Sequence, residues 1–115
     1  MCPIGGPANC NRPIGCTANA SICDAIYRMA IITFDYDGIP RVVEPHYYGL
    51  TSQARQAVRG YQTNWGGVRS SEPNWHLFAL DKIDGLRVTS SRFGGTHTGY
   101  NPDDMQMNGY FARVE

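Results

Sequence analysis

The chain has 115 residues, of which 42% are hydrophobic, and its ten basic side chains balance ten acidic ones. A chain of this length is typical of one domain and buries a sufficient core without metals or disulfides. The zero net charge excludes a general electrostatic attraction to nucleic acid or to an anionic membrane, so any such binding requires a local patch.

The sequence has no recognisable membrane-spanning or export segment. It contains no run of about 18 apolar residues. The opening residues, MCPIGGPANC, have neither the basic start nor the apolar stretch of a signal peptide. We therefore expect a cytoplasmic protein with no membrane partner.

Residues 1–19 are dense in Gly, Pro and Asn, which disfavour a stable helix or strand. All four cysteines lie between positions 2 and 23, separated by seven, five and six residues. A disulfide scaffold spreads its bridges over the whole fold, and structural zinc sites pair ligands about two to four residues apart. We therefore expect a flexible arm over residues 1–19 with free thiols, a buried Cys23 on a helix, and no metal or cofactor.

Residues 20–115 are expected to form the single folded domain, which starts with a short helix. Ser21 is suited to cap this helix, and Asp24 three residues later would complete a capping box. Ile22 and Ile26 then share one apolar face. A helix this short depends on packing for its stability.

The clearest local signal is a β-hairpin. Residues 30–36 (AIITFDY) are rich in β-branched and aromatic side chains, and Asp37-Gly38 is a pair that two-residue type I′ turns favour. The return strand is expected to end at Pro45, because proline cannot donate to a strand ladder. A polar connection is then expected over residues 46–55.

Further strands alternate with turn signals in the rest of the chain. Turn-forming residues predict a loop at 64–73, a glycine-ended helical turn at 81–85 and a short helix over 101–107. The β-prone segments between them predict strands over residues 56–63, 75–80, 86–93 and 109–114. Five or six short strands separated by turns are typical of a small barrel or a strongly bent sheet.

Several strings in this order resemble the WYL domain, a bacterial module named for a Trp-Tyr-Leu string. The matching strings are IITFDY at residues 31–36, RVVEPH at 41–46, and LFALDKI at 77–83 with Gly-Leu at 85–86. Short stand-alone members of the family are the most similar, through VVEPH…YG at 42–49 and VRGYQ…GG at 58–67. The resemblance covers about residues 20–95.

This resemblance implies a mainly β fold, in the form of an Sm-like small β-barrel with five or six antiparallel strands and a short N-terminal helix. It also implies a domain that senses a ligand or binds nucleic acid in a regulatory role. A fold does not by itself determine function, so the site residues must carry the functional argument.

The residues show no catalytic arrangement. Catalysis requires a nucleophile with a base, paired carboxylates or a metal cage within mutual reach. His46, His76 and His97 are scattered, and no pair of them has the i, i+4 spacing by which a helix holds zinc. We therefore expect a non-enzymatic binding protein with no catalytic residues and no metal ligands.

A local excess of arginine among aromatic residues is the candidate binding site. Guanidinium groups pair with phosphate or carboxylate, and aromatic rings stack on bases or other planar ligands. We expect one pocket for an anionic or planar ligand, such as a nucleotide or nucleic acid, formed by Arg41, His46, Tyr48, Arg59, Tyr61 and Arg69.

Other interpretations of the same residues stay open. Arg41 could form a surface salt bridge with Glu44 or Asp35, and Tyr61 could belong to the core. The second functional hypothesis is a module for protein interaction or self-association. It would act through an edge strand or through Trp65 on a glycine-rich loop, with a homo-oligomer as one outcome.

Overall fold

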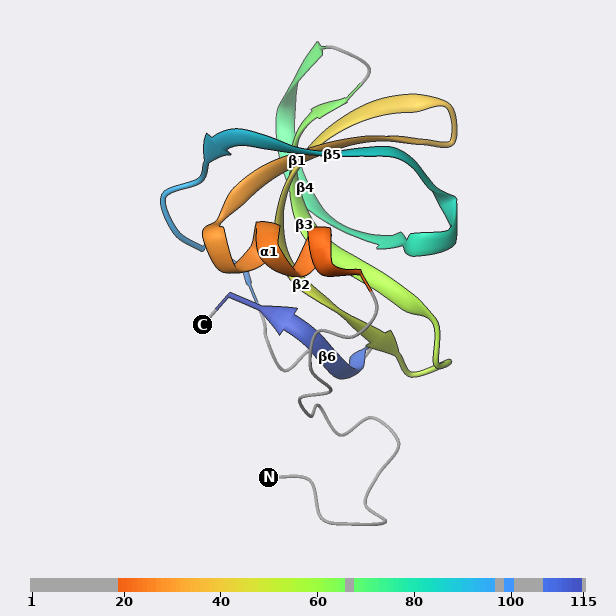
Figure 1. The fold of residues 1–115 in the computed structure, drawn as a ribbon. Coiled ribbons are helices and arrows are strands. Elements are labelled where there is room, and N and C mark those ends of the chain that lie inside the picture. Colours follow the sequence, from red (N-terminus) through yellow and green to blue (C-terminus); the bar gives the residue numbers. More distant parts are fainter. Residues whose placement is uncertain (1–18, 66–67, 97–98, 101–106, 115) are drawn as a thin grey trace.

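The computed structural model of the chain describes residues 19–65, 68–96, 99–100 and 107–114. Within these residues, six antiparallel strands form one open sheet with a short helix beside it (Figure 1), which confirms the mainly β prediction. In chain order the elements are α1 (Ala20–Arg28), β1 (Ala30–Tyr36), β2 (Ile39–Thr51), β3 (Gln56–Trp65), β4 (Val68–Ala79), the 3-10 helix η1 (Leu80–Lys82), β5 (Ile83–Arg92) and β6 (Met107–Arg113).

Helix α1 begins earlier than predicted. The side chain of Asn19 caps it by accepting a hydrogen bond from the backbone N–H of Ile22 at 3.1 Å, so the expected cap residue Ser21 lies inside the helix. Asn and Ser are both good N-cap residues, and Asn19 is the one that directly precedes the first turn of the helix. Ile22, Cys23 and Ile26 are buried, as the apolar spacing predicts.

The hairpin of β1 and β2 has the predicted turn. Asp37 and Gly38 have φ angles of 55° and 74°, and Tyr36 pairs with Ile39 across them. Positive φ at both central residues is the signature of a type I′ turn, whose twist matches that of the flanking strands.

Strand β2 does not end at Pro45, and the predicted connection over residues 46–55 is wrong for most of its length. The strand continues to Thr51, with an irregularity in its pairing with β3 between Pro45 and Tyr47. At this irregularity β2 exchanges one neighbour for another: its first half pairs with β1 and its second half pairs with β6. The bulge absorbs the proline, so the strand bends instead of stopping.

The predicted loop over residues 64–73 is also wrong. Strand β3 extends to Trp65, β4 starts at Val68, and Asn64 pairs with Arg69. Pairing with β3 outweighs the weak β-propensity of this Ser- and Asn-rich segment, because β-propensity depends strongly on context. The expected helix over 101–107 lies outside the described residues except for Met107, which begins β6.

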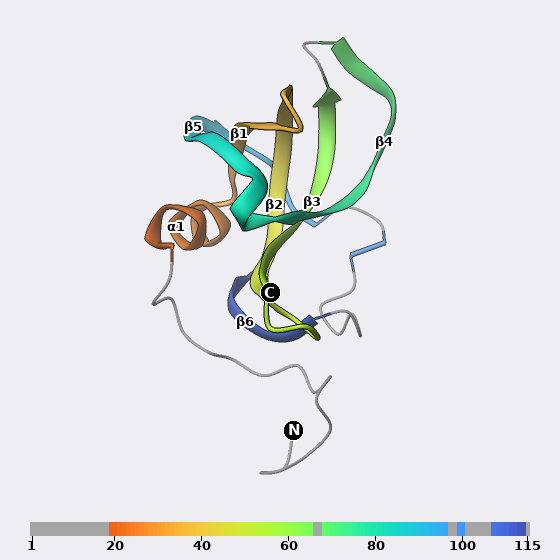
Figure 2. The ribbon, with the colours of Figure 1, turned by 90° about the vertical axis from the view of Figure 1, so that its right-hand side faces the viewer.

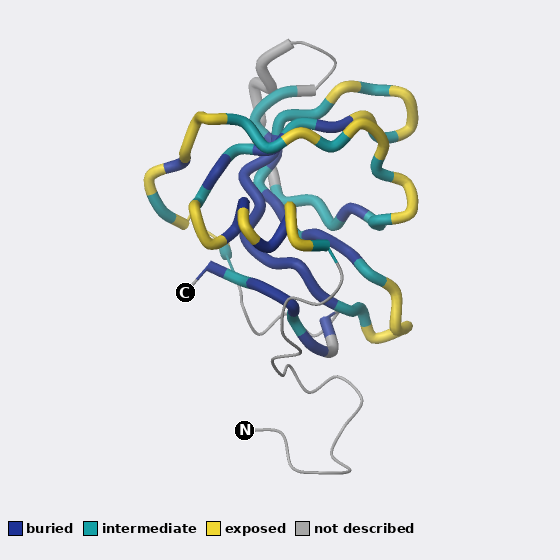
Figure 3. The backbone as a smooth tube through the Cα atoms, in the orientation of Figure 1, coloured by how far each residue is buried: buried dark blue, intermediate teal, exposed yellow. Residues whose placement is uncertain are grey.

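The two hydrophobic clusters of the core lie largely on one face of the sheet, which we call the inner face. Tyr48 and Val58 of this face pack with Ile22 and Ile26 of α1. Phe78 lies on the same face and belongs to a second cluster with Phe34, Val43 and Ile32. Figure 2 shows α1 beside the curled sheet, and Figure 3 shows that the buried residues concentrate along β2 and β6 and on one side of α1.

The two ends of the sheet approach each other through side chains. Strand order is β4-β3-β2-β1-β5, and within the described residues no pairing joins β4 to β5. The ring centroids of Tyr36 in β1 and Phe78 in β4 are 5.0 Å apart, and the Tyr36 hydroxyl accepts a hydrogen bond from the Ala79 N–H at 3.1 Å. The sheet is therefore strongly curled, although it remains open.

Cys23 is disulfide-bonded. This contradicts the expectation of free thiols for the one cysteine that the structure describes. The other three cysteines, like the expected arm apart from Asn19, lie outside the described residues. None of the described helices has the length and apolar character needed to cross a membrane.

Candidate functional site

His46, a predicted ligand residue, is fully buried in the sheet. Its ring stacks on Phe93 at 4.9 Å between centroids and meets Trp75 edge-on at 4.7 Å. Its Nδ1 lies 2.8 Å from the carbonyl oxygen of Glu44, and because a carbonyl only accepts, Nδ1 donates. The imidazole is therefore an aromatic core residue, held at the bulge of β2, and it offers no surface to a ligand.

Tyr48, also predicted to bind ligand, is fully buried on the inner face. Its hydroxyl donates to Oε1 of Gln56 at 2.6 Å. Burial raises the pKa of the Tyr48 phenol above its usual 10.0, and a hydrogen bond from the backbone of Asn19 offsets part of that rise. The phenol stays protonated at neutral pH and acts as a fixed donor to Gln56.

Arg59 and Tyr61 lie on the outer face of the sheet, opposite the core. Register pairs Arg59 with Tyr47 and Leu77, and alternation along β3 places Tyr61 on the same side. Tyr61 meets Trp75 edge-on at 5.4 Å. Both Tyr61 and Trp75 are half-buried, intermediate between core and exposed surface.

The side chains of Arg69 and Trp65 lie outside the described residues. Their backbones belong to β4 and β3, so Trp65 is a strand residue rather than part of a long loop. The six predicted ligand residues therefore do not form one pocket: two are buried, two lie on the outer face, the side chain of one is not described, and Arg41 lies on the inner face.

Arg41 is the predicted residue that the structure places in a distinctive setting. It pairs with Phe34 on the inner face, at the end of the apolar core. Its Nη1 donates to Oε1 of Gln62 at 3.0 Å and its Nη2 donates to the carbonyl oxygen of Tyr36 at 3.2 Å. The guanidinium carbon lies 5.6 Å from the centroid of the Tyr36 ring, within cation–π distance.

The salt bridges considered for Arg41 are absent from the described part of the chain. Glu44 and Asp35 occupy strand positions of opposite parity to Arg41 and to its partner Phe34, so both belong to the outer face. Nε of Arg41 is buried and has no hydrogen-bond partner among the described residues. A guanidinium has five N–H donors. Two of its hydrogen bonds are accounted for, and no carboxylate neutralises its charge among those residues.

His76 lies near Arg41 on the inner face. It pairs with Gly60, the inner-face position next to Gln62 on β3, and its ring lies 5.6 Å from that of Phe78. Burial lowers the pKa of His76 below its usual 6.5, and the positive charges of Arg41 and Arg59 lower it further. We call Tyr36, Arg41, Gln62 and His76 the Arg41 cluster.

Three members of the Arg41 cluster, Tyr36, Gln62 and His76, were missed by sequence reasoning. The missing information was the register between β2 and β3. A return strand that stops at Pro45 brings neither Gln62 nor His76 to Arg41, whereas the observed strand pairs Val43 with Gln62. The signal available in the sequence was the run HYYGLT after Pro45, whose β-branched and aromatic residues favour a longer strand.

Comparison of the chain with protein-family models, with curated proteins and with solved structures finds no match. Among the described residues, no group of three or more His, Cys, Asp and Glu side chains is placed to hold a metal ion.

Proposed function

We propose that this chain is a non-enzymatic binding module, related to stand-alone WYL domains, that recognises a small anionic ligand through the Arg41 cluster. The observation that carries the proposal is the buried Nε of Arg41, which has no hydrogen-bond partner among the described residues. The short helix before the first hairpin and the contact of Tyr36 with Phe78 and Ala79 support a curled, barrel-like sheet of the Sm-like kind.

Arg41 is expected to attract an anion because a half-buried cation is energetically unfavourable. A buried donor without a partner costs about 1–3 kcal/mol, and more when it is charged. An anion beside the guanidinium would offset the cost of its charge by accepting from the Nη groups, and hydrogen bonds that involve an ionised group are about twice as strong as neutral ones. The hydrogen bonds to Gln62 and Tyr36 already fix the guanidinium, so little conformational entropy is lost on binding.

The chemical class of the ligand follows from the same geometry. A guanidinium matches phosphate and carboxylate oxygens in a bidentate arrangement. His76 adds a second group that becomes a cation when protonated, and the rings of Tyr36 and Phe78 border the site. We propose a phosphate- or carboxylate-bearing small molecule, with a regulatory role for its binding, and we expect single-stranded nucleic acid to compete for the same site.

Calorimetric titration with sodium pyrophosphate in about 50 mM salt tests this proposal. Arg41→Gln is expected to weaken binding by about tenfold or more, because it removes the charge and the bidentate donors. The matched control is Arg87→Gln, which removes the same charge from an exposed position of β5. A thermal unfolding curve for each variant shows whether the fold is retained.

Equal weakening in both variants would contradict the proposal, as would a native chain that does not bind pyrophosphate. Arg41→Lys adds a second measurement, since it keeps the charge and loses the planar fork. An affinity between those of the native chain and Arg41→Gln supports a geometric role for the guanidinium. A short oligonucleotide titrated in parallel reports nucleic-acid binding by its steep dependence on salt.

The alternative function is protein interaction or self-association through a strand edge. One observation favours it: within the described residues, β4 pairs only with β3 and β5 pairs only with β1. Such edges can pair with another chain. If this is the main function, the chain dimerises with increasing concentration and Arg41→Gln leaves that dimerisation unchanged.

A further inference from the structure

A separate groove lies at the other end of the β2–β3 hairpin, away from the Arg41 guanidinium. One hollow of about 280 Å³ lies between the turn that joins β2 to β3 and the end of β4. A second, larger hollow of about 610 Å³ shares Arg55 and Gln56 with it and extends to Asp81 of η1. Because they share these residues, we treat the two hollows as one surface and call it the turn groove.

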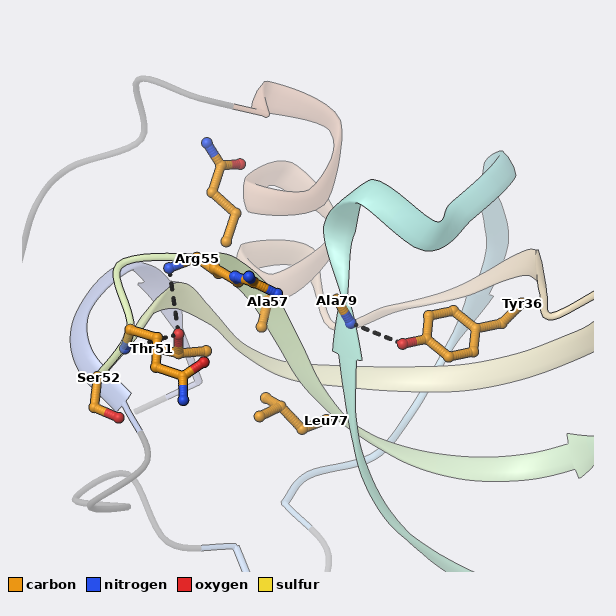
Figure 4. Close-up of a pocket in the computed structure, with 9 residues that line it drawn as sticks. Tyr36, Thr51, Ser52, Arg55, Ala57, Leu77 and Ala79 are labelled. Atoms are coloured by element: carbon orange, nitrogen blue, oxygen red, sulfur yellow. Dashed lines mark hydrogen bonds between the residues drawn. The ribbon is translucent and has the colours of Figure 1, made fainter.

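The two sides of the first hollow differ in chemistry (Figure 4). Turn residues such as Thr51, Ser52 and Arg55 form one side, and Leu77, Ala79 and Tyr36 form the other, with Ala57 between them. The Ala79 N–H is already used by the Tyr36 hydroxyl. This side of the groove therefore offers mainly apolar surface.

The polar side is held in place by the local backbone. The hydroxyl of Thr51 accepts hydrogen bonds from the backbone N–H groups of Gln53 and Arg55, both at 3.2 Å. The Thr51 N–H donates to the carbonyl oxygen of Arg55 at 2.8 Å, which closes the turn. Ala54 is in the left-handed region with φ of 61°. These hydrogen bonds fix the backbone of Arg55 and therefore the position of its Cβ.

The side chain of Gln56 is held by a hydrogen bond to the core residue Tyr48. Its Oε1 accepts from the buried Tyr48 hydroxyl at 2.6 Å, which leaves the amide NH2 as the outward donor. Gln56 lines both hollows of the groove. Tyr48 therefore acts as a positioning residue for the groove even though it is itself fully buried.

Arg55 and Asp81 supply opposite charges to the same hollow. Both are exposed, and among the described residues neither forms an ion pair. Leu77 and Ala79 line the first hollow and not the second, so a ligand that uses this apolar wall and both charges spans the two hollows. Such a ligand carries a carboxylate, an ammonium group and an apolar side chain. The first hollow, which holds the apolar wall, has a volume of about 280 Å³, just below the about 300–1,000 Å³ typical of ligand pockets, so the apolar group must be small.

We infer that the turn groove binds a free α-amino acid with an apolar side chain. Arg55 and the Gln56 amide receive the carboxylate, Asp81 receives the ammonium group, and the side chain lies against Leu77 and Ala79. Both charged residues are exposed and therefore screened by water, so we expect a dissociation constant of about 1 mM. This inference does not depend on anion binding by the Arg41 cluster.

NMR titration of the full chain with L-leucine tests the inference. Leucine is expected to shift the amide signals of Ala57 and Leu77. N-acetylleucine lacks the ammonium group, leucinamide lacks the carboxylate and glycine lacks the apolar group. Each of the three is expected to bind about fivefold more weakly or worse, because each loses one of the three interactions.

Matched variants locate the binding. Arg55→Gln and Asp81→Asn are expected to weaken leucine binding by about fivefold, whereas Arg87→Gln and Asp84→Asn make the same charge changes at exposed positions that do not line the groove. Each of three results would overturn the inference. The first is no shift at about 20 mM leucine, which is far above the expected dissociation constant. The second is binding of N-acetylleucine and leucinamide as tight as that of leucine, and the third is a loss of affinity in the control variants equal to that in Arg55→Gln and Asp81→Asn.

Discussion

At the scale of single residues, the buried polar groups differ in whether their hydrogen-bond partner lies within the described residues. His46 and Tyr48 are fully buried, and each has a hydrogen-bond partner inside the protein. Arg41 differs from them because its Nε is buried and has no partner among the described residues. A residue type that suggests ligand binding in the sequence can therefore be structural, and only burial and partners separate the two roles.

Gly49 of β2 gives a residue-scale prediction about the packing of β6. A Cβ at Gly49 would overlap the carbonyl oxygen of Gly109 and lie 2.7 Å from Cα of Tyr110. Because these are backbone atoms, the strand must move to accept even one methyl group. We expect Gly49→Ala to lower the free energy of unfolding by about 3 kcal/mol, measured by denaturant titration.

Gly94→Ala is the control for this prediction. A Cβ at Gly94 would meet no atom within 4 Å, and the residue is exposed. Its effect on the free energy of unfolding is expected to stay within about 0.5 kcal/mol. If Gly49→Ala were as mild as Gly94→Ala, β6 would not pack against β2 as described.

The composition of the Arg41 cluster could be predicted only in part at this scale. Arg41 was identified because arginine among aromatic residues favours anion binding. Its partners Gln62 and His76 come from two other strands and depend on the register of the sheet. Glutamine and histidine carry no local signal that points to Arg41, so the sequence alone could not select them.

At the scale of the elements, local chemistry predicted well and long-range pairing did not. The turn at Asp37-Gly38 was predicted correctly because two residues determine it. The end of β2 was predicted wrongly because Pro45 is accommodated by a bulge that only the neighbouring strands reveal. In the same way, residues 64–65 and 68–73 belong to strands because β3 and β4 pair with each other, and not because of their own propensity.

The open edges of the sheet give an element-scale prediction. Strand β2 has neighbours on both edges, whereas β4 and β5 each have one neighbour among the described residues. We expect the amides of Tyr47 and Tyr48 to exchange with deuterium among the slowest in the chain, and the outward-facing amides of β4 and β5 to exchange quickly. Hydrogen exchange followed by NMR measures both groups at once.

Protein concentration provides the control for the edge prediction. If the edges stay open in solution, the exchange rates in β4 and β5 do not depend on concentration. Slower exchange confined to these strands at higher concentration would contradict the open-edge account and support self-association by edge pairing.

At the scale of the whole molecule, the chain forms a strongly curled sheet with α1 packed beside its core, and this arrangement separates two regions of different chemistry. The Arg41 cluster lies on the inner face beyond the apolar core, and the turn groove lies at the β2–β3 turn. Tyr36 contributes to both, since its ring lies beside the Arg41 guanidinium and its hydroxyl binds Ala79 at the groove. The mainly β fold followed from the sequence, whereas the placement of these regions required the curl of the sheet.

The disulfide bond of Cys23 also could not be predicted from the sequence. The confinement of all four cysteines to positions 2–23 argued against a disulfide scaffold, yet Cys23 is disulfide-bonded on a helix whose other apolar residues fill the core. Spacing along the chain does not report distance in space, and only the fold brings sulfur atoms within bonding range.

The central claim is that the Arg41 cluster binds an anion, and the pKa of His76 tests it most directly. In the free protein this pKa is expected below 6.5, because burial and the charges of Arg41 and Arg59 disfavour the imidazolium. A bound anion offsets the positive charge, so it should raise the pKa of His76. By linkage, binding should then take up protons and become tighter as the pH falls through the pKa of the bound form.

The decisive measurement is an NMR titration of His76 against pH, without and with saturating pyrophosphate, with the signal assigned through His76→Gln. We expect pyrophosphate to raise the pKa of His76 in the native chain. In Arg41→Gln we expect a higher pKa in the free protein and little further change on addition of pyrophosphate. A His76 pKa that is the same with and without pyrophosphate in the native chain would contradict the account.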